Sequence, residues 1–296
     1  MNEKKEKKTG DLFSNFVQTV ETIRTTSSKN KKIDLISNYI FQLDDNSLYI
    51  AVLFLSGRIF PRGSSSNLNI GFRTILQILF SLSNLNDSDI RRIHLQEGDI
   101  GAIAEFAISK KKVLTLFNHI EPEEGREGRL TLNDIYNQFK KIANINGPHS
   151  NNDKKNLLKG LLLRCSPLEA KYLIKIITGE LRIGSYEGLV EISIAKAFGK
   201  EIKSVREAIL IYGDIAKVAL LSKKNLLDTI SIDPFVPMSF MLADVMFTPD
   251  EIIEYFKNPF SVNTNMTELE SSYINLVINV NFFLEIFQIY QINSLK

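Results

Sequence analysis

The sequence of 296 residues predicts an all-α protein, on three observations. Apolar residues recur at spacings of three and four through most of the first 225 positions, a pattern typical of amphipathic helices that pack on one another. The alternation typical of strands never persists there for more than a few residues. With 44% apolar and 24% charged residues, the composition is that of a globular chain and excludes a disordered or collagen-like one.

The first helical group is expected over residues 12–145. An apolar stripe over residues 12–23 predicts its first helix, and Thr131 is a plausible N-cap for its last. Glycine, proline and three serines between positions 57 and 66 predict a loop. The other expected helices of this group are 34–43, 48–55, 70–82, 100–109 and 132–143.

A second helical group is expected over residues 151–224. Ser166 can cap a helix whose first position is Pro167, and Gly199 and Gly213 are expected to end later helices. The expected helices are 154–164, 167–178, 189–198, 202–212 and 214–221.

Charge and composition change near residue 225. Residues 1–224 carry 34 basic and 25 acidic side chains, a net charge of +9, whereas residues 225–296 carry 2 and 9, a net charge of −7. Four prolines then divide the chain into extended pieces. We therefore expect a disordered basic start at 1–11, a helical domain at 12–224, a proline-rich linker at 225–262 and a separate tail at 263–296.

The chain offers little for a disulfide, a zinc site or a membrane span. Cys165 is the single cysteine, and the three histidines are scattered along the sequence. The charged start is not followed by an apolar stretch, so it is not a secretory signal, and six polar residues interrupt the apolar segment 274–292. We expect a cytoplasmic protein without a membrane span.

Two glycine-containing loops before helices are candidate anion sites. In the loop 181–188, Gly184 allows close backbone approach, Arg182 is a fork-shaped phosphate donor and Ser185 adds a hydroxyl. The loop 147–155 offers Gly147, Ser150, Lys154 and Lys155 ahead of a helix, where a basic first turn would oppose the helix dipole and favour a counter-anion.

Each loop also has a purely structural interpretation, without an anion, that stays open. The first loop can be a helix end with a solvent-facing arginine, and the second can carry ordinary surface lysines. Residues 150–212 contain eleven basic and seven acidic side chains, a modest excess that fits phosphate contact or a plain solvated surface. Phosphate loops, dinucleotide-binding glycine motifs and the motifs of zinc peptidases and serine hydrolases are missing from the sequence.

Several segments together resemble the N-terminal DNA-binding domain of ATP-dependent DNA ligases. The longest is the run from Cys165 to Gly184, which contains Gly-Glu-Leu-Arg-Ile-Gly. Further segments follow the order of that family, namely 56–61, 69–71, 98–101, 104–105, 187–191, 195–198, 213–220 and 234–243. The resemblance covers residues 12–262, or 251 of the 296 residues.

The resemblance implies a multi-helix domain that grips double-stranded or nicked DNA through its backbone, without reading sequence, in replication, repair and recombination. It assigns phosphate contacts to the two loops, and so to Arg182, Gly184, Ser185 and the four residues of the second loop. The family usually has a basic residue where Tyr186 stands, so a weaker grip is expected.

The sequence departs from the family pattern in its catalytic motif. Family members use ATP and Mg²⁺ to load AMP on a lysine in a Lys-x-Asp-Gly motif, but this chain has no Asp-Gly dipeptide. Lys257 and Lys296 are the lysines after position 224, and neither begins the motif. We therefore expect no catalytic residue, metal or cofactor in this chain, and we interpret it as a truncated ligase or one whose reading frame changed near residue 262.

Three alternatives stay open at this point. The chain can be a helical protein-interaction scaffold, a decayed ligase remnant, or one half of a ligase that a separate catalytic chain completes. In each case we expect a monomer, associated with the nucleoid if the source is prokaryotic.

Overall fold

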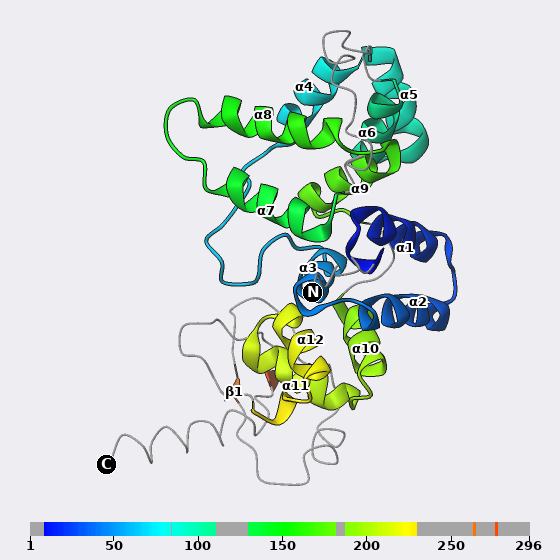
Figure 1. Ribbon diagram of the computed structural model, residues 1–296, viewed down its shortest axis with the longest axis vertical. Helices are drawn as coiled ribbons and strands as arrows, with labels where there is room; N and C mark the ends of the chain where they lie inside the picture. The colour runs from blue at the N-terminus through cyan, green and yellow to red at the C-terminus, as the bar shows by residue number, and fades with distance from the viewer. Residues whose placement is uncertain are drawn as a thin grey trace, which may run out of the picture. The chain divides into compact units, whose positions relative to one another are not determined.

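The structure is a computed structural model that describes residues 9–83, 85–110, 130–181 and 187–229, together with the backbone of residues 263–264 and 276–277 (Figure 1). Two compact units divide the chain, Met1–Ser239 and Phe240–Lys296. In the second unit, β1 (Asn263–Thr264) pairs antiparallel with β2 (Leu276–Val277). The secondary-structure elements described in the first unit are all helices, which confirms the all-α prediction.

Twelve α-helices lie in the described part of the first unit. They are, in chain order, α1 (Phe13–Thr25), α2 (Lys29–Phe41), α3 (Asp45–Leu55), α4 (Phe72–Leu82), α5 (Asp87–Glu97), α6 (Ile100–Ser109), α7 (Leu132–Ala143), α8 (Ser150–Leu163), α9 (Pro167–Thr178), α10 (Glu187–Ala197), α11 (Ile202–Tyr212) and α12 (Ile215–Lys223). Two short 3₁₀ helices, η1 (Thr9–Asp11) and η3 (Leu227–Thr229), stand at the ends of this series.

Most of the expected helices are confirmed, and the differences lie in polar segments. The bounds of α6, α7, α9 and α11 coincide with the expected ones. Helix α5 was not expected, and α8 begins at Ser150, four residues before the expected start. The expectation of a start without structure through residue 11 is wrong for Thr9–Asp11.

Helices from the two expected groups pack on one another. Helix α6 packs along α9, α2 along α10, and α3 along α12. Helices α4 and α8 also contact each other, and α7 contacts both α3 and α8 (Figure 1). The division at residues 145–151 is thus a division of the sequence, while the described helices share one core.

Aromatic side chains form the centre of that core. The rings of Phe16 and Phe54 meet edge to face with their centroids 5.9 Å apart, and those of Phe54 and Phe139 do so at 6.0 Å. All three side chains are fully buried, and such ring pairs add to the stabilisation that burial of their apolar area supplies. These contacts join α1, α3 and α7.

Helix ends carry the caps that the sequence predicts. Thr131 and Ser166 each complete a capping box, with Asp134 and Glu169 respectively, and Pro167 stands at the first position of α9. Gly213 ends α11 in the left-handed region with φ of 64°, where glycine is not strained. These three predictions are confirmed.

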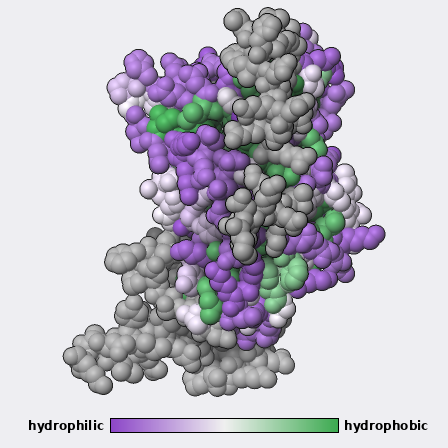
Figure 2. Space-filling view, in the orientation of Figure 1, coloured by the Kyte–Doolittle hydropathy of each residue, from purple (hydrophilic) through white to green (hydrophobic). Residues whose placement is uncertain are grey.

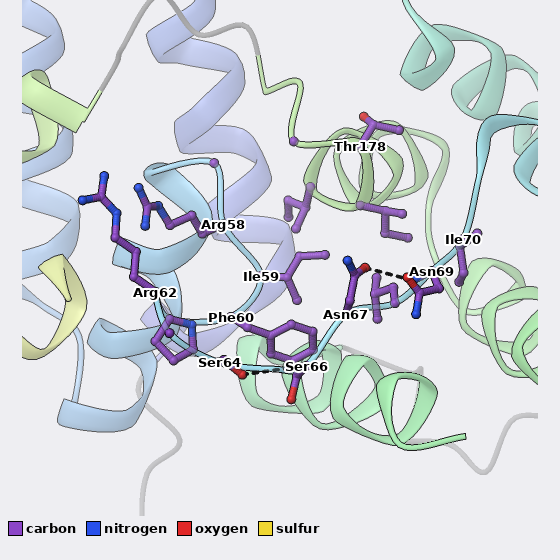
Figure 3. A pocket seen from close by; sticks show the side chains of 17 residues that line it. Arg58, Ile59, Phe60, Arg62, Ser64, Ser66, Asn67, Asn69, Ile70 and Thr178 are labelled. Carbon is purple, nitrogen blue, oxygen red and sulfur yellow. Dashed lines mark hydrogen bonds between the residues drawn. The ribbon is translucent and has the colours of Figure 1, made fainter. Parts of the chain in front are cut away.

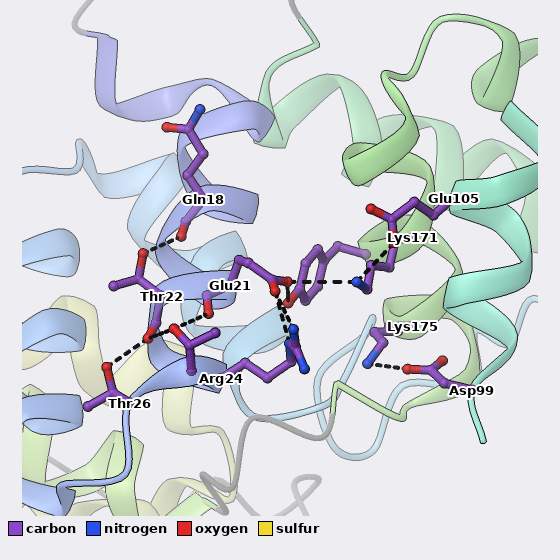
Figure 4. A network of polar contacts seen from close by, with 11 residues as sticks. Gln18, Glu21, Thr22, Arg24, Thr26, Asp99, Glu105, Lys171 and Lys175 are labelled. Carbon is purple, nitrogen blue, oxygen red and sulfur yellow. Dashed lines mark hydrogen bonds and ion pairs between the residues drawn. The ribbon is translucent and has the colours of Figure 1, made fainter. Parts of the chain in front are cut away.

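Helices α6 and α9 approach closely at Gly101. A Cβ added there would lie 2.9 Å from the Lys171 carbonyl oxygen and 2.9 Å from Cγ of Lys175. Lys175 is 2% exposed and forms an ion pair with Asp99, whose other carboxylate oxygen accepts a hydrogen bond from the Gly101 N–H at 2.7 Å (Figure 4). A small residue at 101 therefore permits the crossing that this buried ion pair requires.

Among the described residues, the exposed large hydrophobic side chains are Phe41, Phe72, Leu95, Leu163 and Leu226. On the face drawn in Figure 2, hydrophobic residues gather only in small groups among hydrophilic ones. Within the described residues, no helix is both long enough and apolar enough to cross a membrane.

Candidate nucleic-acid interface

The connection between α3 and α4, residues 56–71, is an ordered series of turns that we call the α3–α4 segment. The Ser64 hydroxyl accepts a hydrogen bond from the Ser66 N–H at 3.1 Å, and the Asn67 side chain accepts one from the Asn69 N–H at 3.0 Å (Figure 3). The backbone at Asn69 is left-handed, with φ of 52°, a conformation that asparagine tolerates better than most residues. Side-chain contacts within the segment thus fix its course.

The α3–α4 segment contacts the described ends of both candidate anion loops. The Lys154 ammonium of α8 donates a hydrogen bond to the Leu68 carbonyl oxygen at 3.0 Å. At the other loop, Gly57 and Gly179 meet backbone to backbone, since a Cβ on Gly57 would lie 3.8 Å from the Gly179 carbonyl oxygen. Both glycines have positive φ, 75° and 72°, so side chains at these positions would be strained.

Two arginines of the α3–α4 segment share one carboxylate. Nη2 of Arg58 lies 3.4 Å from Oε2 of Glu187, and Nη2 of Arg62 lies 3.1 Å from the same oxygen. Glu187 is the first residue of α10, where a carboxylate also interacts favourably with the helix dipole. Arg58, Arg62 and Glu187 form what we call the arginine cluster.

Burial and neighbouring charges together set the pKa of Arg58 in the arginine cluster. Partial burial lowers the pKa of Arg58, the neighbouring Arg62 lowers it further, and the charges of Glu187 and Asp214 only partly offset these effects. Asp214 is itself buried at the start of α12, where it accepts hydrogen bonds from the Tyr49 hydroxyl at 3.1 Å and the Ala216 N–H at 2.9 Å. The carboxylates of Glu187 and Asp214 thus both act on the Arg58 cation.

A cavity of about 500 Å³ lies between the α3–α4 segment and the end of α9. Ile59 and Phe60 lie between the two arginines and the Asn67–Asn69 pair, and the two guanidinium groups point the same way (Figure 3). One surface of the molecule therefore offers cationic, amide and hydroxyl groups within a single segment.

The candidate residues of the first loop, Arg182, Gly184 and Ser185, lie outside the described residues. Leu181 before them is 4% exposed, and Glu187 after them belongs to the arginine cluster. The phosphate contacts assigned to these three residues stay predictions.

The second loop differs from the expectation in two respects. Because α8 begins at Ser150, Asp153 lies in its first turn and the lysines follow one turn later, so the expected basic first turn is wrong. The expectation of an exposed donor at Lys154 is also wrong, since the side chain is 6% exposed and its ammonium binds Leu68. Lys155 is partly exposed, and Gly147 is exposed with φ of 94°.

The arginine cluster was not predicted from the sequence. Glu187 follows Arg58 by 129 residues and Arg62 by 125 residues, and a sequence pattern does not connect residues so far apart. The available signal was the pair of arginines inside a loop of glycine, proline and serine, where solvated side chains are ordinary.

Other candidate groups have structural explanations. Burial raises the pKa of the Cys165 thiol to about 12, so Cys165 is a small residue of the core and its thiol stays protonated near neutral pH. His149 is exposed in a left-handed conformation before α8, while His119 lies outside the described residues. Among the described side chains, no group of three or more acidic, histidine or cysteine residues could hold a metal ion.

Comparison with known proteins identifies the family. Residues 12–195 match the sequence model of a family described as DNA ligase N terminus. The chain is 34% identical over 243 residues to a probable DNA ligase of Koribacter versatilis, an overlap of 82% of this chain and 40% of that protein. It is 32% identical over 238 residues to a DNA ligase of Archaeoglobus fulgidus, an overlap of 79% of this chain and 41% of that protein.

The chain thus spans about two fifths of the length of these two relatives. The match over residues 12–195 contains the α3–α4 segment, both candidate loops and the arginine cluster. By sequence and by its helical fold, the chain belongs to the DNA ligase family and corresponds to the N-terminal region of that family.

Proposed function

We propose that this chain is the DNA-binding region of an ATP-dependent DNA ligase. It grips nicked duplex DNA through the phosphate backbone, without preference for sequence, and does not seal the nick by itself. In the complete ligase this grip serves DNA replication, repair and recombination in the cytoplasm.

One observation carries the proposal beyond family membership. The α3–α4 segment binds the ends of both candidate loops, through Lys154 on one side and through Gly179 and Glu187 on the other. Two loops held by one segment can contact one ligand together, and phosphate contacts of this kind position a protein on a duplex without reading its bases.

The residues of this chain do not supply the chemistry that sealing a nick requires. The Lys-x-Asp-Gly motif that accepts AMP in the family is missing from the sequence, so ATP and Mg²⁺ have no role in the proposed activity of this chain. A catalytic part, in the same ligase or on a separate chain, must supply that chemistry.

Titration of a fluorescent nicked duplex with the full chain tests the grip. We expect binding at low salt and equal affinity for duplexes of unrelated sequence. The logarithm of the binding constant should fall linearly with the logarithm of the salt concentration, with a slope of about −0.9 for each phosphate neutralised. Lack of binding to nicked duplex at low salt would overturn the proposal, and so would a strong dependence on sequence.

Incubation with ATP and Mg²⁺ followed by intact mass measurement tests the absence of chemistry. We expect no mass increase of one AMP and no sealing of the nicked duplex. A covalent AMP adduct would show that another lysine replaces the missing motif.

A further inference from the structure

We propose that Arg58 and Arg62 form an additional binding site for a phosphate of the DNA backbone, and that Glu187 is its internal counter-ion in the free protein. The inference rests on the proposed DNA binding and adds a site that neither candidate loop contains. Its ligand is a phosphodiester.

Geometry makes the arginine cluster suitable for such a ligand. The two guanidinium groups reach the same oxygen of Glu187, at 3.4 Å and 3.1 Å, so they converge on a point that a phosphate oxygen can occupy. The side chains of Arg58, Arg62 and Glu187 retain exposures of 25%, 35% and 29%. They are therefore held in place while solvent, or a ligand, still reaches them.

The number of donors points the same way. The two guanidinium groups share one oxygen of Glu187, while Asp214 acts on Arg58 through its charge. Each guanidinium carries five N–H donors in a planar fork that suits phosphate, more than one carboxylate can accept. A phosphate brings further acceptor oxygens for these donors.

Position connects this site with the predicted loops. Glu187 directly follows the loop that contains Arg182, and Gly57, next to Arg58, lies against Gly179 at the other end of that loop. A backbone phosphate at the arginine cluster would therefore lie near both ends of that loop.

Competition between phosphate and Glu187 gives the site a specific signature. In the free protein Glu187 offsets the repulsion between two partly buried cations, but it must release them, at least in part, when a phosphate binds. Removal of the charge of Glu187 should then tighten DNA binding, whereas removal of either arginine should weaken it.

The experiment measures the dissociation constant of nicked duplex for the full chain and four variants across a salt series. We expect Arg58→Ala and Arg62→Ala each to weaken binding about tenfold, as loss of one charge-assisted hydrogen bond implies, and to reduce the salt slope by about one. Glu187→Gln should bind several-fold more tightly than the wild type. Unfolding cannot produce that gain.

Arg92→Ala is the matched control. Arg92 also forms an exposed ion pair, with Asp89, but it lies on α5 and contacts Phe106 instead of the α3–α4 segment. Its loss removes the same charge and should change affinity by less than about twofold through general electrostatics. Thermal unfolding followed by circular dichroism checks that each variant is folded.

The outcomes separate this site from the proposed function. If the wild type binds nicked DNA but both arginine variants match Arg92→Ala, or if Glu187→Gln weakens binding, the site is refuted while DNA binding stands. If the wild type does not bind, the proposed function itself fails. Inorganic phosphate at constant ionic strength should compete with the DNA phosphodiester for the cluster, and so reduce the difference in affinity between wild type and Arg62→Ala; a difference that phosphate leaves unchanged would refute a phosphate site.

Discussion

Two adjacent lysines of α8 have different surroundings, although the sequence treats them alike. Lys154 is buried and binds the Leu68 carbonyl oxygen, whereas Lys155 is partly exposed. Helical geometry turns neighbouring side chains by about 100°, so one residue can face the core while the next faces solvent. Lys154 is thus a tie between α8 and the α3–α4 segment.

We predict that Lys154→Met lowers the free energy of unfolding by about 1–3 kcal/mol, because it leaves a carbonyl oxygen buried without its partner. Lys155→Met should leave stability within about 0.5 kcal/mol and weaken binding to nicked duplex. Urea unfolding and DNA titration of the two variants measure both effects. A loss of affinity confined to Lys154→Met would reverse these assignments.

Two helical glycines, Gly101 and Gly160, differ in the space that is available for a side chain. Gly101 lies where α6 meets α9, and a Cβ there would meet backbone and side-chain atoms at 2.9 Å. Gly160 in α8 is exposed, and a Cβ added there would find open space within 4 Å.

Gly101→Ala should therefore destabilise the protein by about 1–3 kcal/mol, the usual cost of overpacking a filled core. Gly160→Ala is the matched control and should stabilise it by about 0.5–1 kcal/mol, because alanine has the higher helix propensity. The denaturant midpoints of the two variants, compared with that of the wild type, measure these opposite changes in stability. Equal shifts in one direction would mean that propensity alone governs both positions.

At the scale of the elements, apolar periodicity and caps predicted most of the fold. The bounds of α7 and α9 followed from apolar stripes that begin directly after Thr131 and Ser166, each with an acidic residue three positions later. Helix α5 was missed because Ile93 is its one buried apolar residue and its sequence is mostly polar. Packing on α6 supplies what the local pattern lacks.

The start of α8 was misjudged for a similar reason. Ser150 and the three polar residues after it look like a loop, yet they form the first turn of the helix, with Asp153 suitably placed for the helix dipole. His149 before them adopts φ of 70° and gives no side-chain cap, so the sequence held no capping signal there. The same misjudgement gave Lys154 an exposed position, and hence a wrong part of the candidate site.

We predict that Ser166→Ala lowers the free energy of unfolding by about 1 kcal/mol, since it removes the side-chain acceptor for the Glu169 N–H and half of the capping box of α9. Ser81→Ala, in the last turn of α4 where the hydroxyl donates a hydrogen bond to the Ile78 carbonyl oxygen, is the control. Its effect should stay within about 0.5 kcal/mol. Thermal unfolding of both variants gives the comparison.

At the scale of the whole molecule, a polar network joins three helices. The Tyr172 hydroxyl of α9 and the Arg24 guanidinium of α1 both donate to Glu21 of α1 (Figure 4). Lys171 lies between Glu21, at 4.0 Å, and Glu105 of α6, at 2.9 Å. Three helices that are distant in sequence thus share a set of charges.

This network makes stability depend on pH. Partial burial raises the pKa of Glu21, but hydrogen bonds from Arg24 and Tyr172 and the charge of Lys171 outweigh it, so the net pKa lies below the ordinary value of 4.5. A carboxyl with a lowered folded pKa contributes its full stability above the unfolded pKa and loses it as pH falls through the folded pKa.

We therefore expect the free energy of unfolding to decrease as the pH falls below about 4.5, with part of the decrease due to Glu21. Urea unfolding at pH 7, 5, 4 and 3 measures it. In Glu21→Gln the protein should be less stable at pH 7, and the decrease toward pH 3 should be smaller. A Glu21→Gln chain with the pH dependence of the wild type would contradict this role of the network.

The pairing of early helices with late ones has a consequence during synthesis. Helices α2 and α3 pack on α10 and α12, which are more than 140 residues further along the chain. While a ribosome makes the protein, α2 and α3 therefore lack these two partners until α10 and α12 have emerged, with apolar faces such as that of Ile36 and Ile40 still incompletely covered. At a synthesis rate of about 5–20 residues per second this wait lasts roughly ten seconds or more, which makes the nascent chain a natural client for chaperones that cover exposed apolar surface.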